Sequence, residues 1–183
     1  MSIFTNHMMM AGAVTTAIAG GYTIDNSCIW NDSDAAYLHR TPDSDGNLKT
    51  WTFSGWFKRG SRNGRQSVLS ATTSQLDFQD EASDYRLQFN ISGVAGLSSG
   101  STGKDPVFDP TAWYHCMWVF DSTNATQLDR TKFYINGSQV TTVATSGSGS
   151  ALNFDWVFND ATHQMELGYY CSVVPYDGYM AEI

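Results

Sequence analysis

The sequence predicts an all-β domain built as a sandwich or a barrel, and three observations carry this prediction. Aromatic residues make up 14% of the 183 residues and charged residues only 15%, and aromatic side chains fit the pleated surface of a sheet. Gly, Asn, Asp and Ser gather in short clusters that are typical of turns. Between the turns lie many short apolar runs, and no stretch shows a convincing 3.6-residue hydrophobic period.

Nine strand-like runs follow one another along the chain, and its length suits one domain that buries a core without disulfides. The runs cover residues 27–31, 35–40, 49–59, 66–71, 84–91, 112–121, 131–140, 164–170 and 176–183. The turn motifs PDSDGN, RGSRNGR, SSGSTG and SGSGS separate several of them. This spacing of short strands and turns is the main support for a sandwich or barrel.

The dipeptide Asn136-Gly137 predicts a tight hairpin inside residues 131–140. Both residues accept the positive φ that the two central positions of a type I′ turn require. Alternation along the first strand would place Phe133 and Ile135 on one face of the sheet and Tyr134 on the other.

The run AWYHCMWVFD (112–121) places His115 beside Cys116, and strand geometry argues against a reactive pair. Successive side chains of a strand point to opposite faces, so the imidazole and the thiol would be separated by the sheet. Trp113, His115 and Met117 would share one face, and Cys116 and its alternate neighbours the other. We therefore expect a buried structural cysteine.

Residues 1–25 are predicted to form an extended arm ahead of a domain that occupies residues 26–183. The arm contains the apolar run MMMAGAVTTAIAGG (8–21), in which Ala17-Ile18-Ala19 is similar to a signal cleavage site. A secretory signal also has a positive start, and residues 1–7 contain no Lys or Arg. The run is too short to cross a bilayer. We expect a retained arm, with a cleaved signal peptide as the alternative.

Charge and motifs exclude several classes of function. A formal net charge of −8 argues against nucleic-acid binding, because contact with phosphates needs clustered Lys and Arg. The common catalytic and phosphate-binding motifs do not occur, and the histidines lack a second ligand at metal-binding spacing. We expect no cofactor and no metal. Four carboxylates predict an exposed acidic loop, with a hard-cation site in that loop as the alternative: Asp77, Asp80, Glu81 and Asp84.

The three cysteines, Cys28, Cys116 and Cys171, lie far apart in the sequence. An odd number at such spacings predicts buried free thiols and not a disulfide framework.

Three segments in order resemble the laminin-G-like branch of the concanavalin A-like lectin/glucanase superfamily. They are KTWTFSGWFKRG (49–60), TAWYHCMWVFD followed by DRTKFYINGSQV (111–140), and MELGYY with YDGYMAEI (165–183). The resemblance covers residues 27–183 and implies a two-sheet antiparallel jelly-roll sandwich, concanavalin A-like, with the extended N-terminal arm in front. It also implies a last strand that continues past Ile183, so we expect the natural chain to be longer.

Residues 1–50 are similar to a version of this domain in structural proteins of tailed, especially marine, bacteriophages. In these proteins a short apolar arm and a lead like GYTIDNS (21–27) precede a segment like AYLHRTP (36–42). The similarity implies a virion protein whose arm docks on a neighbouring capsid or tail subunit. It implies a homotrimer that decorates the particle or binds a host glycan, with no nucleic-acid or membrane partner.

No enzymatic activity is expected from the resemblance. The superfamily's glucanases carry acidic residues as E-x-D-x-E on one strand face, and these 183 residues do not contain that pattern. The alternative function is a secreted carbohydrate-binding protein or glycan hydrolase, with the first 19 residues removed.

Candidate ligand-binding residues come from aromatic rings beside polar groups, the combination that sugar sites use. The loop at 154–160 offers Trp156 with Asp155 and Asn159, and a second segment offers Tyr169 and Tyr170. Among the other aromatic residues, Trp56 and Trp113 are expected as core anchors.

Overall fold

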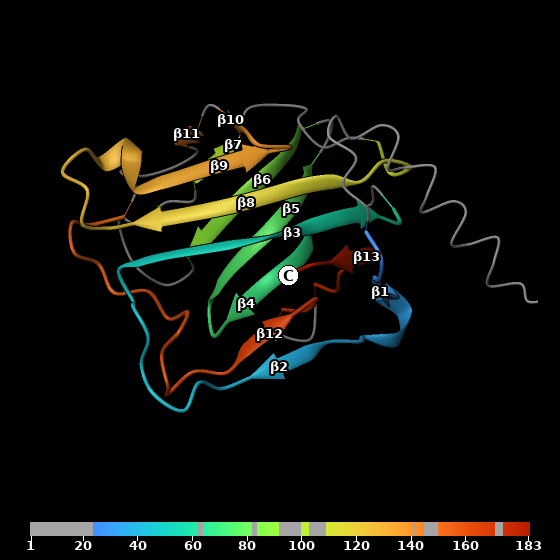
Figure 1. Ribbon diagram of the computed structural model, residues 1–183, viewed down its shortest axis with the longest axis horizontal. Coiled ribbons are helices and arrows are strands. Elements are labelled where there is room, and N and C mark those ends of the chain that lie inside the picture. The colour runs from blue at the N-terminus through green and yellow to red at the C-terminus, as the bar shows by residue number, and fades with distance from the viewer. Residues whose placement is uncertain are drawn as a thin grey trace, which may run out of the picture.

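A computed structural model shows two antiparallel sheets packed face to face (Figure 1). The structure describes residues 24–61, 64–81, 84–91, 100–102, 109–140, 142–144, 150–170 and 174–183. The predicted arm therefore lies almost entirely outside the described residues. Among these residues no helix has the length and hydrophobicity that crossing a membrane requires.

The first sheet has six strands in the order β1-β13-β3-β8-β9-β10. Its strands are β1 (Cys28–Trp30), β13 (Gly178–Ala181), β3 (Thr50–Arg59), β8 (Tyr114–Asp121), β9 (Thr131–Ile135) and β10 (Ser138–Val140). The second has seven in the order β11-β7-β6-β5-β4-β12-β2. They are β11 (Thr142–Ala144), β7 (Gly100–Thr102), β6 (Asp84–Ile91), β5 (Ser74–Glu81), β4 (Gln66–Ala71), β12 (Met165–Leu167) and β2 (Leu38–Arg40).

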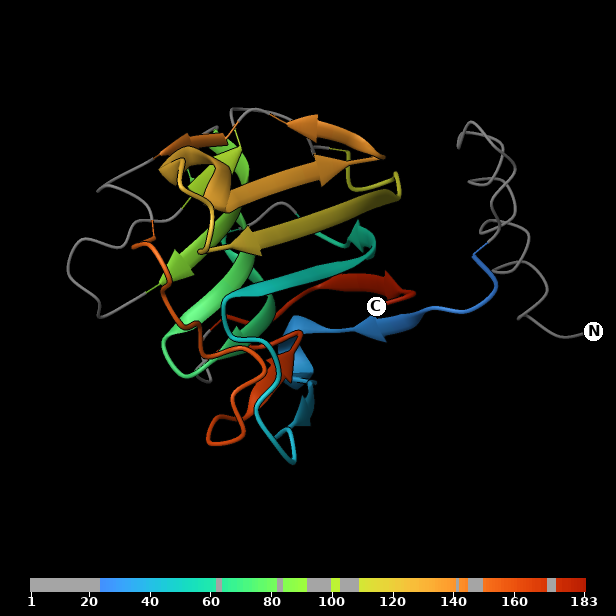
Figure 2. The ribbon, with the colours of Figure 1, turned by 60° about the vertical axis from the view of Figure 1, so that its left-hand side comes forward.

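The core lies between the two sheets and is rich in aromatic rings. Phe57 and Trp118 of the six-stranded sheet meet Phe78 of the seven-stranded sheet with ring centroids 5.6–6.1 Å apart. The strands of the two sheets run at an angle to each other in both views of the ribbon (Figures 1 and 2). The structure thus confirms the predicted all-β sandwich.

Strand β8 confirms the interpretation of the His–Cys pair. Cys116 and Trp118 are fully buried in the core, whereas His115 lies on the outer side, where its ring is 5.2 Å from that of Trp56. Burial raises the pKa of the Cys116 thiol, and partial burial lowers the pKa of His115. A neutral thiol on the opposite face of the sheet cannot act as the nucleophile of this imidazole.

The hairpin between β9 and β10 forms as predicted. Asn136 has φ 49° and Gly137 φ 80°, and Ser138 pairs with Ile135 directly across the turn. The Asn136 side-chain oxygen also accepts a hydrogen bond from the His115 backbone N–H at 2.9 Å. The turn residue therefore ties the hairpin to the start of β8.

Two expectations from the sequence are wrong. Residues 74–81 form strand β5 in the middle of the seven-stranded sheet, so Asp77 is fully buried and not part of an exposed acidic loop. Cys28, expected to be a buried thiol, is exposed. Trp56 is buried as expected, in a second, smaller core cluster with Ile24 and Ala181, against which the partly buried Trp113 packs. This cluster occupies the outer face of the six-stranded sheet, because Ala181, Trp56 and His115 are paired across β13, β3 and β8.

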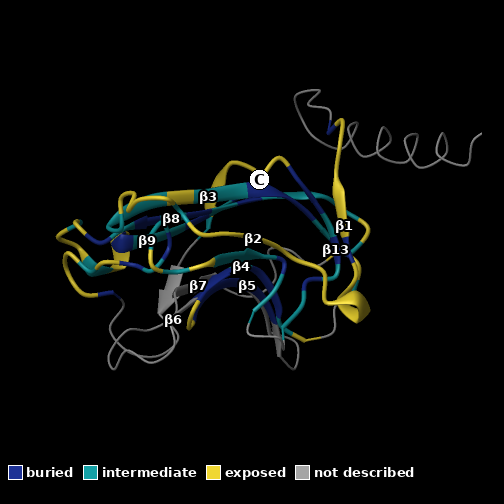
Figure 3. Cartoon of the chain, turned by 90° about the horizontal axis from the view of Figure 1, so that it is seen from below, coloured by how far each residue is buried: buried dark blue, intermediate teal, exposed yellow. Residues whose placement is uncertain are grey.

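The seven-stranded sheet is curved. In Figure 3, β5 arches toward the six-stranded sheet, so the opposite side of the seven-stranded sheet is concave. We call this outer side the concave face.

Candidate functional site

Five polar side chains meet on the concave face. In β5, Leu76 and Phe78 point into the core, so alternation directs Gln75 and Asp77 to the concave face. Residues paired across neighbouring strands share a face, and the register pairs Gln75 with Ser70 and Asp77 with both Ser67 and Gln88. We call these residues the concave-face cluster: Ser67, Ser70, Gln75, Asp77 and Gln88.

The cluster is buried, yet several of its polar atoms are not hydrogen-bonded. Gln75 is 1% exposed, and within the described part of the chain neither its side-chain nitrogen nor its oxygen has a partner. The same holds there for the Ser67 hydroxyl and the Gln88 side-chain oxygen. Burying an amide without hydrogen bonds costs about 1–3 kcal/mol. Within the described residues these donors and acceptors have no partner, and the Gln75 side chain is covered from solvent.

Asp77 carries the buried negative charge of the cluster. Its Oδ2 lies 3.0 Å from Nε of Arg65, and the side chain of Asp77 is fully buried. The Arg65 guanidinium carbon lies 5.9 Å from the ring centroid of Tyr170. The carboxylate is thus neutralised by an arginine that also contacts a predicted ligand-binding tyrosine.

An open depression adjoins the cluster. It has a volume of about 310 Å³ and is lined by Ser70, Thr72, Thr162, His163, Gln164 and Glu166. Glu166 of β12 is paired with Ser70 on one side and with His39 of β2 on the other, so all three face the concave side. Because Ser70 belongs to both the cluster and the depression, the two form one continuous polar surface.

The wall of the depression is fixed by local hydrogen bonds. Asp160 Oδ1 accepts hydrogen bonds from the backbone and hydroxyl of Thr162, and Asp160 Oδ2 lies 3.1 Å from Nδ1 of His163. The Thr162 side chain, then the Thr162 backbone and His163, lower the pKa of Asp160. These contacts lie within residues 160–163 and fix the turn that forms one wall of the depression.

A pair of tyrosines borders the polar surface at β2. The rings of Tyr37 and Tyr169 stack with centroids 5.3 Å apart and an interplanar angle of 12°. Tyr37 is 43% exposed, and its ring lies 5.8 Å from that of His39. The Tyr169 carbonyl accepts a hydrogen bond from the Ser70 hydroxyl at 2.7 Å. We call Tyr37 and Tyr169 the edge pair.

The structure divides the five predicted ligand-binding residues. Tyr169 and Tyr170 lie beside the concave-face cluster. The Tyr169 carbonyl accepts a hydrogen bond from Ser70, and the Tyr170 ring contacts the Arg65 guanidinium. Trp156 is 1% exposed and packs in the core, with its ring 4.7 Å from that of Phe120. This burial weighs against a role for Trp156 in binding.

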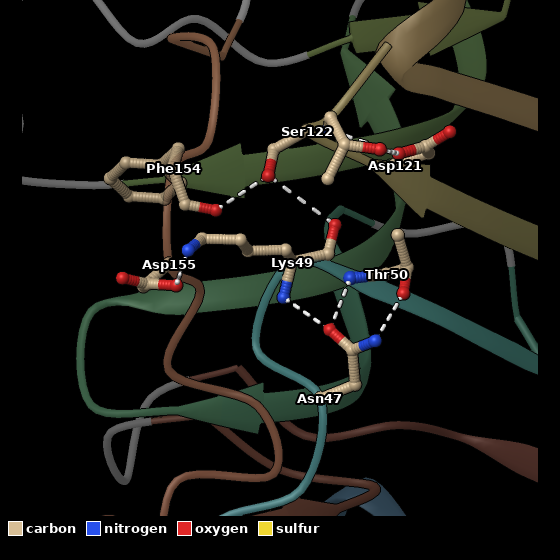
Figure 4. A network of polar contacts seen from close by, with 8 residues as sticks. Asn47, Lys49, Thr50, Asp121, Ser122, Phe154 and Asp155 are labelled. Carbon is tan, nitrogen blue, oxygen red and sulfur yellow. Dashed lines mark hydrogen bonds and ion pairs between the residues drawn. The ribbon is translucent and has the colours of Figure 1, made fainter.

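Asp155 and Asn159 hold the loop of residues 154–160 against residues 46–50. Asp155 Oδ1 lies 3.6 Å from the ammonium of Lys49, next to a network through Asn47 and Ser122 (Figure 4). Asn159 has φ 66°, and its carbonyl accepts a hydrogen bond from the Gly46 N–H at 2.8 Å. Ligand binding by the five residues stays a prediction.

The sequence reasoning missed the concave-face cluster because it missed β5. The segment SQLDFQDE (74–81) alternates polar and apolar residues at Gln75, Leu76, Asp77 and Phe78, which is the period of a half-buried strand. The four carboxylates in and after this segment predicted an exposed loop instead.

Comparison with known protein families and structures identifies the fold. The profile of the concanavalin A-like lectin/glucanases superfamily matches residues 31–182. Comparison with curated protein sequences gives no match. The heptameric SAP-like pentraxin from Limulus polyphemus is 12% identical, with a TM-score of 0.50, over 81% of this chain and 74% of that one.

Two further structures share the fold. The CBM40 of the Ruminococcus gnavus IT-sialidase is 15% identical, with a TM-score of 0.52, over 79% of this chain and 88% of that one. Mouse laminin α1 domains LG4–5 are 9% identical, with a TM-score of 0.54, over 87% of this chain. This chain spans 41% of the length of that laminin structure. At these identities the likeness concerns the fold alone, and it confirms the predicted jelly-roll sandwich.

Proposed function

Because this chain belongs to the concanavalin A-like lectin/glucanases superfamily, we propose that it binds a glycan on the concave face of its seven-stranded sheet. The observation that carries the proposal is the open depression lined by His163, Gln164 and Glu166, which adjoins the exposed ring of Tyr37 through His39. A sugar presents many hydroxyls, each both a donor and an acceptor. Amide, hydroxyl and carboxylate groups match them with directed hydrogen bonds.

The edge pair supports the same function. Specific sites combine apolar or aromatic surface with a few placed polar groups. Tyr37 offers part of its ring to solvent beside His39 and Glu166. The C–H face of a sugar ring can pack on such an aromatic surface while its hydroxyls reach the polar residues. The R. gnavus structure of the same fold carries the name CBM40 and comes from a sialidase.

We propose that the protein is not a glycan hydrolase. A glycosidase uses a pair of free carboxyl groups beside the scissile bond. Asp77 is fully buried and paired with Arg65 at 3.0 Å, so it cannot serve as the partner of Glu166 in such a pair.

We further propose that the domain is displayed on the virion of a tailed bacteriophage, as a homotrimer tethered by residues 1–25. The resemblance of residues 1–50 to phage structural proteins supports this location. The Limulus pentraxin of the same fold is heptameric, so this sandwich is compatible with symmetric assembly. A secreted carbohydrate-binding protein remains the second candidate, since Ala17-Ile18-Ala19 is similar to a cleavage site.

A glycan array tests the binding function. We expect the full chain to bind at least one glycan and Gln164→Ala, in the lining of the depression, to weaken that binding about tenfold, as loss of a direct polar contact does. Gln139→Ala is the matched control, because Gln139 is an exposed glutamine on the other sheet. Failure of the wild-type chain to bind any glycan, or equal binding by Gln164→Ala, would overturn the proposal.

The intact mass of the protein from its natural source tests the location. A mass that includes residues 1–19, measured on purified particles, is the expected result. A mass that lacks these residues would contradict the anchoring arm and favour secretion.

A further inference from the structure

We propose that, in the free protein, residues 8–21 pack across the outer face of the chain's own six-stranded sheet, on the side of the sandwich opposite the concave face. The attachment to a particle proposed above would then transfer this segment from its own sheet to a neighbouring subunit. Packing of the segment and glycan binding involve different sheets and are independent of each other.

The chain reaches the outer face at Ile24, directly after residues 1–23, which lie outside the described part of the structure. Ile24 is 9% exposed and packs with Trp56 of β3 and Ala181 of β13. In Figure 3 the chain ahead of β1 rises on the outer side of the six-stranded sheet. The five residues that follow Ile24 are exposed, so Ile24 is an anchor separate from β1. The segment ahead of Ile24 therefore starts from this face.

Apolar and aromatic side chains continue from this anchor across the sheet. In β8 and β9, the core residues Trp118 and Phe133 alternate with side chains that point outward. The register and the ring contacts bring the outward side chains of five strands together. We call this group the outer apolar face: Ile29, Trp56, Trp113, Met117, Tyr134 and Tyr179.

The described residues cover the outer apolar face only in part. Trp56 is buried where Ile24 lies against it. Ile29 is 66% exposed, and Met117 and Tyr134 are half-buried. A contiguous apolar surface on a folded domain commonly marks a contact site. Ile24 thus covers one part of this face, and the remainder is suited to further apolar residues.

The segment ahead of Ile24 has the composition that this face requires. Residues 1–23 contain no Asp, Glu, Lys or Arg, and the run MMMAGAVTTAIAGG (8–21) consists of apolar and small residues with two Thr. Burying such a run leaves no charge without a partner. Gly20-Gly21 allows the backbone to turn onto the sheet. The small Ala and Gly side chains permit a close approach to the indole rings.

The distances allow this contact within one molecule. From Trp56 of β3 to Tyr134 of β9 is two strand spacings, about 10 Å. Gly21 precedes Ile24 by three residues, and an extended chain covers about 3.3 Å per residue, so the run begins within reach of the face. A tethered segment also binds at a high effective concentration. A second copy would instead bring another net charge of −8 against this chain.

Oxidation of methionine side chains tests the packing on the full chain. Hydroxyl radicals convert accessible Met to its sulfoxide, and peptide mass spectrometry gives the rate at each site. We expect Met8–Met10 and Met117 to react about threefold or more slowly in the wild type than in Ile18→Asp, whose charge disfavours burial of the run. Met180, 1% exposed in the core, is the internal reference and should react slowly in both.

Ser2→Asp is the matched control, because it adds the same charge outside the run. It should leave Met117 as slow to react as in the wild type, and circular dichroism confirms that both variants fold. The rates are measured at two protein concentrations to separate the chain's own sheet from that of a second copy. Equal oxidation of Met117 in the wild type and Ile18→Asp, or protection that rises with protein concentration, would overturn packing within one molecule.

Discussion

The outer faces of the two sheets bury side chains of opposite polarity. On the six-stranded sheet, Trp56 packs with Ile24 and Ala181 into a second apolar cluster, and Trp113 lies against it. On the seven-stranded sheet, the outer face buries polar side chains, and the Gln75 amide has no hydrogen-bond partner among the described residues. The apolar cluster on the six-stranded sheet therefore stabilises the fold, whereas the unpartnered polar groups on the seven-stranded sheet lower its stability.

The difference shows that outer strand positions of this sandwich can hold either apolar or polar side chains. An outer strand position is easily filled by an apolar side chain, as Trp56 and Ala181 show. Keeping Gln75 there lowers stability, and sites that lower stability are commonly those that function requires. The comparison predicts opposite results for substitutions on the two faces.

Unpartnered polar atoms also occur inside the core, and they differ in kind. The indole N–H groups of Trp51, Trp118 and Trp156 are buried without a hydrogen-bond partner within the described residues. Each belongs to a large apolar ring among other rings, as in the edge-on contact of Trp51 with Trp156 at 5.5 Å. Gln75 has no such apolar body, and both of its amide atoms are unpaired. The core indoles are therefore compatible with packing alone.

The largest expected effect is on the six-stranded face. Trp56→Ala removes the centre of the outer cluster, and we expect the free energy of unfolding to fall by about 3 kcal/mol or more. Glycan affinity of the folded fraction should not change. Urea denaturation and calorimetry measure the two quantities. Leu128→Ala, at an exposed leucine, should change stability by less than about 0.5 kcal/mol. A similar fall for both variants would contradict the packed cluster.

A gain in stability is expected on the concave face. Gln75→Met keeps the volume of the side chain and removes the unpartnered amide, so we expect the free energy of unfolding to rise by about 1–3 kcal/mol. Gln139→Met, at an exposed position, should leave stability unchanged. A loss of stability in Gln75→Met would show that the amide is satisfied in solution, and the contrast between the faces would disappear.

Local patterns predicted much of the fold, and long-range pairing decided the rest. Alternation in residues 112–121 and the Asn136-Gly137 turn were sufficient for β8 and the β9–β10 hairpin. The concave face depends on the pairing of Glu166 with both Ser70 and His39, residues remote in the sequence. No local signal specifies such a register, because many strands of similar composition compete for it.

Local sequence patterns are also insufficient to predict which residues form the candidate site. Trp156 and Tyr169 both lie in aromatic segments with neighbouring polar residues, and composition alone treats them alike. The Trp156 ring is buried among core rings and its backbone N–H donates to the Leu48 carbonyl, whereas Tyr169 follows β12 and stacks on Tyr37. Tertiary position therefore separates a core residue from a candidate site residue.

The smallest expected effect is a pH dependence confined to the six-stranded face. Burial beside Trp56 lowers the pKa of His115 below its usual 6.5, so the folded state favours the neutral ring. The unfolded chain then binds more protons as pH falls below about 6.5, and stability falls with it. We expect the melting temperature to decline from pH 7.5 to pH 5, and to decline less in His115→Gln.

Measuring only above pH 5 separates the effect of His115 from that of Asp160, whose pKa is also lowered. The stability from Asp160 is present above its usual value of 3.8 and is lost only as pH falls further. An equal decline in wild type and His115→Gln, or a melting temperature that rises toward pH 5, would contradict a neutral, partly buried imidazole. It would also mean that the outer face beside Trp56 is wetter than the packing of its rings implies.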